Sequence, residues 1–296
     1  MTSNLLNRRN ALIGGGATLF VSHVVHAAPN AELQIAALER KIRGRIGVSA
    51  LDTGSGSRIA WRGGERFAMC STFKLLLAAM VLVRCERHQF ASGQRLSFSA
   101  ADLRLPHSPI STAHLHEGGM SAVALCEAAV EASDNLAANT LLRAIGGPPA
   151  LTLWLRNIGD STTRLDRYEL ALNENLPGDP RDTTTPDAML ATMRRVLLGD
   201  VLAPHARELI VGWMRNCRTG LGSLRAGLPR DWVAGDKTGH GTGSGTTAAV
   251  NDLAIAWPPR RAPVLIASYI SGSPAPFPEQ TATHARLARL VGATFA

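Results

Sequence analysis

The stretch AMCSTFKLLLAAMVLV, residues 68–83, decides how the rest of the chain is interpreted. Nine consecutive apolar residues follow Lys74, which predicts a helix buried on all sides and too short to cross a membrane. Ser71 then lies in its first turn, with Lys74 one turn later on the same face. A buried amine can lose its proton and accept one from a serine hydroxyl, which a guanidinium cannot do. The pair predicts a nucleophile and its base, although a serine that merely caps the helix gives the same spacing.

Lysine is rare enough in this chain to carry information. Only three of the 31 Lys and Arg residues are Lys, so arginine is the usual cation wherever a positive charge alone is needed. Two of the three lysines, Lys74 and Lys237, lie in short motifs with a hydroxyl residue nearby. Their retention indicates a chemical role.

Strand patterns lie on both sides of a long helical region. Residues 45–64 read as two strands joined by a Gly/Ser turn, and residues 231–239, 251–259 and 263–273 have strand character again. The region from about Phe67 to Trp213 is helical, with loops expected at 104–111, 114–121 and 173–187. Helices are also expected at 31–44 and 283–295. This order predicts an α+β fold whose sheet is covered by terminal helices. We expect an α/β lobe from residues 28–63 and 215–296, and an all-helical lobe from residues 64–214.

The N-terminal residues 1–27 have the features of an export signal. Arg8 and Arg9 precede a short apolar run, and Val25-His26-Ala27 forms a small-residue cleavage site. The twin arginines favour the route for folded proteins. A frayed N-terminal helix is the alternative.

Composition narrows the function classes. With 296 residues, 45% apolar and 18% charged, the chain can bury a sizeable core. Its net charge of +8 comes from scattered arginines without interleaved aromatics, so we expect no nucleic-acid partner. We also expect no stable membrane span, and a modest positive field suits a small anionic substrate.

Neither a metal nor a cofactor is expected. His114, His116 and Glu117 lack a further ligand cluster, and a strand rather than a helix follows the glycine-rich residues 239–247. The four cysteines have no metal-ligand spacing, and one disulfide of unspecified pairing is possible.

Two further motifs place hydroxyl, amide and amine groups together. Ser133-Asp134-Asn135 precedes a helical pattern, so it is either an N-cap or a hydroxyl and an amide that face a substrate. Lys237-Thr238-Gly239 ends a strand, where an ammonium and a hydroxyl could hold a carboxylate. Gly239 leaves room for close approach of the backbone. An ordinary turn after a strand is the alternative.

Glu169 and Asn173 lie in a charge-rich stretch with little periodicity. Its six other charged residues are expected to form structural ion pairs: Arg164, Asp166, Arg167, Asp179, Arg181 and Asp182. Glu169 and Asn173 lie four residues apart, so their carboxylate and amide could hold a water between them. A surface loop of ion pairs is the alternative.

The four motifs, in this order, resemble those of the class A serine β-lactamases. The resemblance covers the chain from about residue 32 to its C-terminus and includes RLDRYELALN, PGDPRDTTTP and NDLAIAWP. It implies a five-stranded antiparallel sheet flanked by helices, beside an all-helical lobe, with the active site in the cleft between them. It also implies hydrolysis of the β-lactam ring of penicillins and some cephalosporins through a serine acyl-enzyme, and hence resistance to these antibiotics.

The resemblance assigns roles in the acylation step to five residues. Ser71 would be the nucleophile, with Lys74 as its hydrogen-bonded partner, and Ser133 would deliver a proton to the lactam nitrogen. The backbone N–H groups of Ser71 and His240 would form the oxyanion hole. Either Lys74 or Glu169 could be the acylation base.

Binding and deacylation follow in the same way. Asn135 would hold the acylamino group of the substrate, and Lys237 and Thr238 its carboxylate. Glu169 and Asn173 would position the deacylating water. With the export segment, the resemblance implies a periplasmic bacterial protein, which we expect to be a monomer.

The chain departs from the family pattern at several positions. A histidine, His240, follows Gly239, and His107 stands where an aromatic residue usually lines the cleft. Carbapenem-hydrolysing members often have a cysteine at the position of Gly241, paired with a cysteine at the position of Cys70. A penicillin-binding DD-peptidase and a non-hydrolysing β-lactam sensor are the alternatives, and Glu169 argues against the peptidase.

Overall fold

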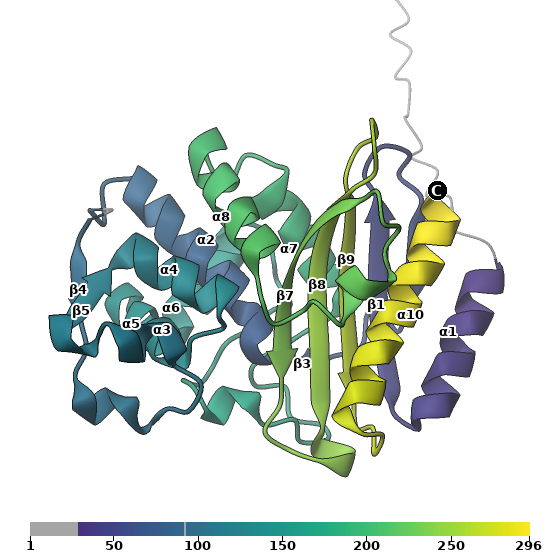
Figure 1. Cartoon of the computed structure of the whole chain (residues 1–296), viewed down its shortest axis with the longest axis horizontal. Helices are drawn as coiled ribbons and strands as arrows, with labels where there is room; N and C mark the ends of the chain where they lie inside the picture. Colours follow the sequence, from purple (N-terminus) through teal and green to yellow (C-terminus); the bar gives the residue numbers. More distant parts are fainter. Residues whose placement is uncertain (1–28, 92) are drawn as a thin grey trace, which may run out of the picture.

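A five-stranded antiparallel sheet forms one side of the molecule (Figure 1). The structure is a computed structural model that describes residues 29–91 and 93–296, so the predicted export segment lies outside the described residues. The sheet order is β2-β1-β9-β8-β7. The strands are β1 (Arg45–Asp52), β2 (Arg58–Trp61), β7 (Val233–His240), β8 (Ala249–Trp257) and β9 (Val264–Ser271). The predicted sheet is thus confirmed, and the glycine-rich residues after 239 form the loop between β7 and β8.

Three helices cover one face of this sheet, and α1 and α10 lie side by side over it in Figure 1. They are α1 (Pro29–Ile42), α9 (Leu224–Gly227) and α10 (Phe277–Phe295). Ile35 of α1 and Leu287 of α10 pack with Ile46 of β1 in a continuous apolar cluster. Because the other face is covered as well, β8 is buried along nearly its whole length instead of alternating.

The second cluster of apolar side chains is centred on α2 (Phe73–Glu86). Every residue from Phe73 to Val83 is buried, which confirms the predicted all-round burial. The helices around it are α3 (Pro109–Ala113), α4 (Ala122–Glu131), α5 (Asn135–Ile145), α6 (Pro148–Asn157), α7 (Pro186–Leu197) and α8 (Pro204–Asn216).

Short strands, which the sequence did not predict, interrupt the helical region. Strand β3 (Phe67–Ala68) pairs with β6 (Thr183–Thr184), and β4 (Arg95–Ser97) pairs with β5 (Gly119–Ser121). Strands of two or three residues are too short to show periodicity, and their partners lie far along the chain. Single turns of 3₁₀ helix lie at Cys70–Thr72, Ala100–Arg104, Leu115–Glu117, Ala171–Asn173 and Gly245–Thr247. Ser71 is therefore in the turn that leads into α2 and not in α2 itself.

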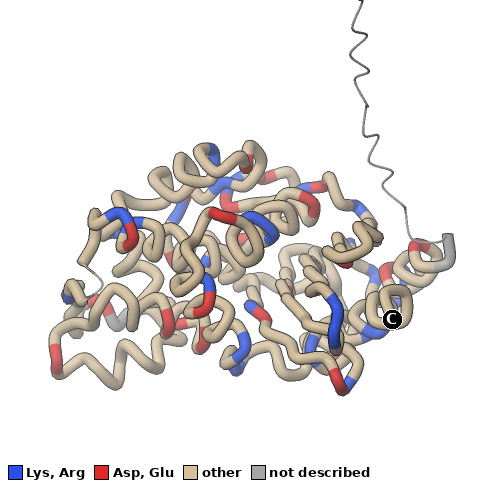
Figure 2. Tube along the Cα trace, turned by 90° about the horizontal axis from the view of Figure 1, so that it is seen from above, with Lys and Arg blue, Asp and Glu red and all other residues tan. Residues whose placement is uncertain are grey.

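Charged residues of both signs are interspersed along the described chain (Figure 2). Across residues 29–91 and 93–296, no helix combines the length and apolar character needed to span a bilayer. The division into lobes at residues 63/64 and 214/215 stays a prediction.

Candidate active site

Lys74 lies at the centre of the candidate site, in the first turn of α2. Its side chain is wholly buried, and its Nζ donates to the Ser133 carbonyl at 2.8 Å and to Asn135 Oδ1 at 2.6 Å. Glu169 Oε1 lies 2.9 Å from the same nitrogen and is also fully buried. Three acceptors around one nitrogen match the three N–H donors of an ammonium. The buried charge is thus paired and fully hydrogen-bonded.

Ser71 faces the same carboxylate oxygen. Its Oγ lies 3.5 Å from Glu169 Oε1. No direct hydrogen bond joins Ser71 Oγ to Lys74 Nζ within the described part of the chain, which corrects the expected Ser71–Lys74 contact. The reason is geometric, because the three donors of Lys74 are already directed at other acceptors.

The turn at residues 133–135 supplies both structural and site-facing groups. Asp134 is the N-cap of α5 and accepts hydrogen bonds from the Ala137 N–H and the Ser111 hydroxyl. Ser133, which has a positive φ of 55°, and Asn135 contact the two buried lysines instead. Asp134 therefore confirms the N-cap interpretation, and the functional interpretation of Ser133 and Asn135 stays a prediction.

Lys237 approaches this turn from β7. Its side chain is buried, and its Nζ donates to Ser133 Oγ at 3.0 Å and to the Thr238 carbonyl at 2.8 Å. Burial is the main cause that lowers the pKa of the Lys237 ammonium to about 8, and the charge of Lys74 lowers it further. Thr238 Oγ1 is hydrogen-bonded to Thr219 Oγ1 at 2.5 Å.

Gly239 brings β7 against the turn that carries the nucleophile. A Cβ at this position would lie 2.7 Å from the Met69 carbonyl oxygen and 3.1 Å from the Ser71 nitrogen. Both are backbone atoms, so a side chain there would push the strand away from Ser71. The requirement for glycine is therefore steric.

The side chain of Asn139 in α5 is hydrogen-bonded to both backbone polar groups of Glu169. Asn139 Nδ2 donates to the Glu169 carbonyl at 3.0 Å, and the Glu169 N–H donates to Asn139 Oδ1 at 2.9 Å. Asn173 Nδ2 donates to Glu169 Oε2, so the predicted carboxylate–amide pair is formed. Sequence reasoning missed Asn139, although its spacing of four from Asn135 places both on one helix face.

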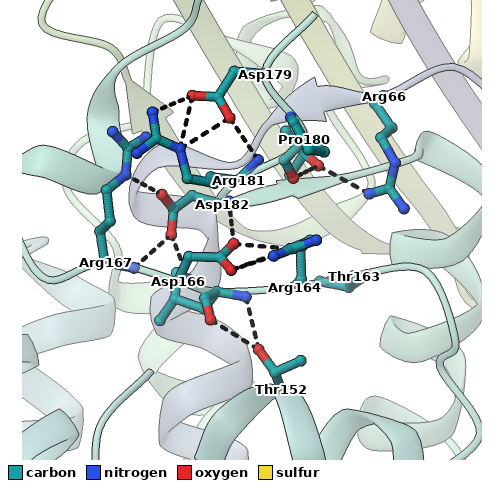
Figure 3. A network of polar contacts seen from close by, with 12 residues as sticks. Arg66, Thr152, Thr163, Arg164, Asp166, Arg167, Asp179, Pro180, Arg181 and Asp182 are labelled. Atoms are coloured by element: carbon teal, nitrogen blue, oxygen red, sulfur yellow. Dashed lines mark hydrogen bonds and ion pairs between the residues drawn. The ribbon is translucent and has the colours of Figure 1, made fainter. Parts of the chain in front are cut away.

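The charged residues around Glu169 form the expected ion pairs (Figure 3). Asp182 accepts from the N–H groups of Asp166 and Arg167 and from the Arg167 side chain. Arg164 binds Asp166, and Arg181 binds Asp179. We call residues 164–182, which carry this network, the Glu169 loop.

The two histidines lie in different settings. The His240 side chain is exposed, and its ring meets that of Phe277 edge-on with centroids 4.7 Å apart. His107 Nε2 contacts the Ala132 carbonyl at 2.9 Å, and its own carbonyl accepts from the Asn135 N–H at 3.1 Å. His107 therefore supports the turn at 133–135.

The four cysteines are free. Cys70 is buried, and burial raises the pKa of its thiol. At Gly241 a Cβ would already lie 3.1 Å from the Ala249 Cβ and 3.2 Å from the Asn173 carbonyl oxygen, so a cysteine there would require a shift of its neighbours. His114 pairs with Glu117 at 2.6 Å, and residues 29–91 and 93–296 contain no group of three potential metal ligands.

Known proteins match this chain along nearly its whole length. The family described as the β-lactamase enzyme family matches residues 30–295. Beta-lactamase Toho-1 of Escherichia coli is 44% identical over 269 residues, which is 90% of this chain and 89% of that protein. The imipenem-hydrolyzing beta-lactamase of Enterobacter cloacae is 40% identical over 270 residues, 91% of each chain. The solved structure of an ancestral class A β-lactamase superposes with a TM-score of 0.85 at 50% identity, covering 88% of this chain and 98% of that one. The chain therefore belongs to the β-lactamase enzyme family, as a member of class A.

Proposed function

We propose that this β-lactamase opens the β-lactam ring through an acyl-enzyme on Ser71. The observation that carries the proposal is the position of one carboxylate oxygen. Glu169 Oε1 lies 3.5 Å from Ser71 Oγ and 2.9 Å from Lys74 Nζ, inside a site where both charged side chains are fully buried. A buried carboxylate that faces a hydroxyl and is oriented by an ammonium can accept the proton of that hydroxyl.

In acylation, Ser71 Oγ attacks the lactam carbonyl carbon while its proton passes to Glu169. We assign the base to Glu169 because an ammonium with all three N–H groups engaged has no lone pair to accept a proton. The carbonyl oxygen becomes negative and would be held by the N–H groups of Ser71 and His240. Collapse of this intermediate breaks the C–N bond, and the nitrogen takes a proton from the Ser133 hydroxyl. Lys237 Nζ donates to that hydroxyl at 3.0 Å and replaces the proton. The net transfer is one proton from Ser71 to the nitrogen, so that Glu169 is again a carboxylate before deacylation.

Three groups would hold the substrate during this step. Lys237 is a buried cation, which suits a carboxylate, and the neighbouring Thr238 would add its hydroxyl. The Asn135 amide, fixed between Lys74 and the Pro106 carbonyl, suits the acylamino group. Fixed polar groups need no reorganisation when the substrate arrives.

In deacylation, Glu169 and Asn173 would orient a water toward the ester carbon. Glu169 takes a proton from the water, the hydroxide adds to the ester, and the departing Ser71 oxygen regains a proton. Deacylation distinguishes a β-lactamase from a DD-peptidase or a non-hydrolysing sensor. Those proteins are acylated by β-lactams but release the acyl group slowly.

The test is Glu169→Gln, which keeps the size of the side chain and removes the base. We expect turnover of benzylpenicillin to fall by about 10³-fold, and intact-protein mass spectrometry to show the enzyme with one added penicillin. Glu208→Gln is the matched control, because Glu208 is exposed on α8. Turnover of the Glu169→Gln enzyme at the wild-type rate would refute the assignment.

We propose penicillins and some cephalosporins as substrates, and not carbapenems, since Cys70 is free and position 241 is glycine. Turnover of nitrocefin, benzylpenicillin and imipenem by the purified protein tests this selectivity.

We also propose that the protein is a monomer located in the periplasm. Fractionation of the expressing cells and light scattering of the purified protein test location and oligomeric state.

A further inference from the structure

A pocket of about 600 Å³ lies behind the Glu169 loop and contains none of the proposed catalytic residues. Its walls come from residues 43–45, from residues 65–68 before the turn that carries Ser71, and from residues 174–183 at and just beyond the end of the Glu169 loop. Thr246 and the end of β9 complete the lining. Arg43, Arg45, Arg66 and Arg181 line this pocket, which we call the arginine pocket.

The carboxylates that line the arginine pocket already have arginine partners. Glu65 is paired with Arg62 at 2.8 Å, and Asp179 with Arg181 at 2.7 Å. Glu174 is paired with Arg167. Only one of these three partners, Arg181, lines the pocket itself. Arg43 and Arg66 therefore have no carboxylate partner among the described residues, and Arg45 shares Glu65 with Arg62.

Those three arginines leave positive charge available. Arg66 donates only to neutral oxygens, the Thr162 carbonyl at 3.1 Å and the Thr183 hydroxyl at 2.9 Å (Figure 3). Arg45 has one carboxylate contact, a long one of 3.6 Å to Glu65, and its guanidinium also lies over the Phe67 ring. Arg43 has no ion pair among the described residues. Arg66 is thus held in place without a carboxylate partner, and Arg45 is only partly compensated by its long contact with Glu65.

We propose that the arginine pocket binds a small, multiply charged oxyanion of the diphosphate kind. Guanidinium groups bind phosphate oxygens in bidentate fashion. An anion between them would offset the charges of Arg43 and Arg66, which have no ion pair among the described residues, and of Arg45, whose only carboxylate contact is long. The volume exceeds what one phosphate fills and falls within the range of small-ligand sites. The inference rests on no step of the proposed catalytic mechanism.

Titration calorimetry with inorganic pyrophosphate tests the proposal, with sodium chloride keeping the ionic strength constant. We expect saturable one-to-one binding by the wild-type enzyme. Arg43→Gln should weaken it about tenfold, because one charge-assisted contact is lost. Arg43 is exposed, so this variant should hydrolyse nitrocefin normally, which shows that it is folded.

Arg260→Gln is a matched control. Arg260 is also exposed, has the same left-handed backbone (φ 58° against 52° at Arg43), and lies in the distant β8–β9 connection. The Arg260→Gln variant should bind pyrophosphate like the wild type.

Hydrogen exchange of the wild-type protein is a second measurement. The backbone amides of residues 43–45 and 174–181 should exchange more slowly when pyrophosphate is added.

Three results would overturn the proposal. These are no saturable binding by the wild type, equal weakening by the two arginine variants, or competition of pyrophosphate with nitrocefin. The last result would place the anion at Lys237.

Discussion

The buried cluster around Lys74 and the ion-pair network of the Glu169 loop both pair a cation with a carboxylate but differ in exposure. Lys74 and Glu169 have no exposed side-chain surface, whereas Arg181 of the network is 47% exposed. Charges out of water interact strongly and are costly to leave unpaired, while exposed pairs are screened. Burial, more than the presence of a carboxylate and a cation, therefore distinguishes the pair that we propose as reactive from the exposed pairs of the network. Asp182 lies between these limits, because it is buried but belongs to the network.

The strongest test of the buried cluster is Lys74→Arg, which keeps the charge. A guanidinium is larger than the ammonium, has a different donor geometry and does not give up a proton, and the side chain at this position is wholly buried. We expect nitrocefin turnover to fall by about 10³-fold. Lys41→Arg, at an exposed lysine of α1, is the control and should keep full activity. Wild-type turnover by Lys74→Arg would mean that neither the size nor the acidity of the amine matters.

The next test moves to the buried member of the network. Asp182→Asn removes a carboxylate that accepts from two backbone N–H groups and the Arg167 side chain. We expect the free energy of unfolding to fall by about 2–4 kcal/mol, together with slower deacylation because the Glu169 loop loosens. Urea denaturation and pre-steady-state nitrocefin kinetics measure the two effects. Unchanged stability would show that buried and exposed pairs of this loop are equivalent.

A smaller effect is expected from pH. The Lys237 pKa is lowered to about 8, so its ammonium loses the proton as the pH rises through that value. The neutral amine binds a carboxylate poorly, so kcat/KM for benzylpenicillin should fall by up to about tenfold per pH unit above pH 8. A pH profile of kcat/KM checks this. A profile that stays flat to pH 10 would argue against carboxylate binding by Lys237.

The smallest effect is expected from Asp179→Asn. Its partner Arg181 is largely exposed, so the pair adds little to stability. We expect a urea midpoint and a nitrocefin turnover indistinguishable from those of the wild type. A loss of stability as large as that of Asp182→Asn would mean that exposed and buried pairs of this loop contribute equally.

Much of the fold and the membership of the site follow from local patterns. The run after Lys74 predicted a buried helix, and the motifs at 71–74, 133–135, 169–173 and 237–239 do converge. Their catalytic roles stay predictions. Each motif consists of a few residues close together in the sequence, so it can be recognised without knowledge of the fold.

The remaining features depend on contacts between distant residues. Asn139 clamps a residue 30 positions away, and β3 pairs with β6 across more than a hundred residues. The direction of the Lys74 N–H groups is set by Glu169, 95 positions further along the chain. Such pairings arise from packing, which no local pattern encodes.

The complete burial of α2 also bears on how the enzyme regains activity after denaturation. Lys74 sits in a helix whose residues from Phe73 to Val83 all contribute to one core, and its partners come from the turn at 133–135 and the Glu169 loop. The constellation cannot form on a partly assembled chain. Return of turnover on refolding should therefore coincide with the last step of core formation, so that activity reports the arrival of the complete native state.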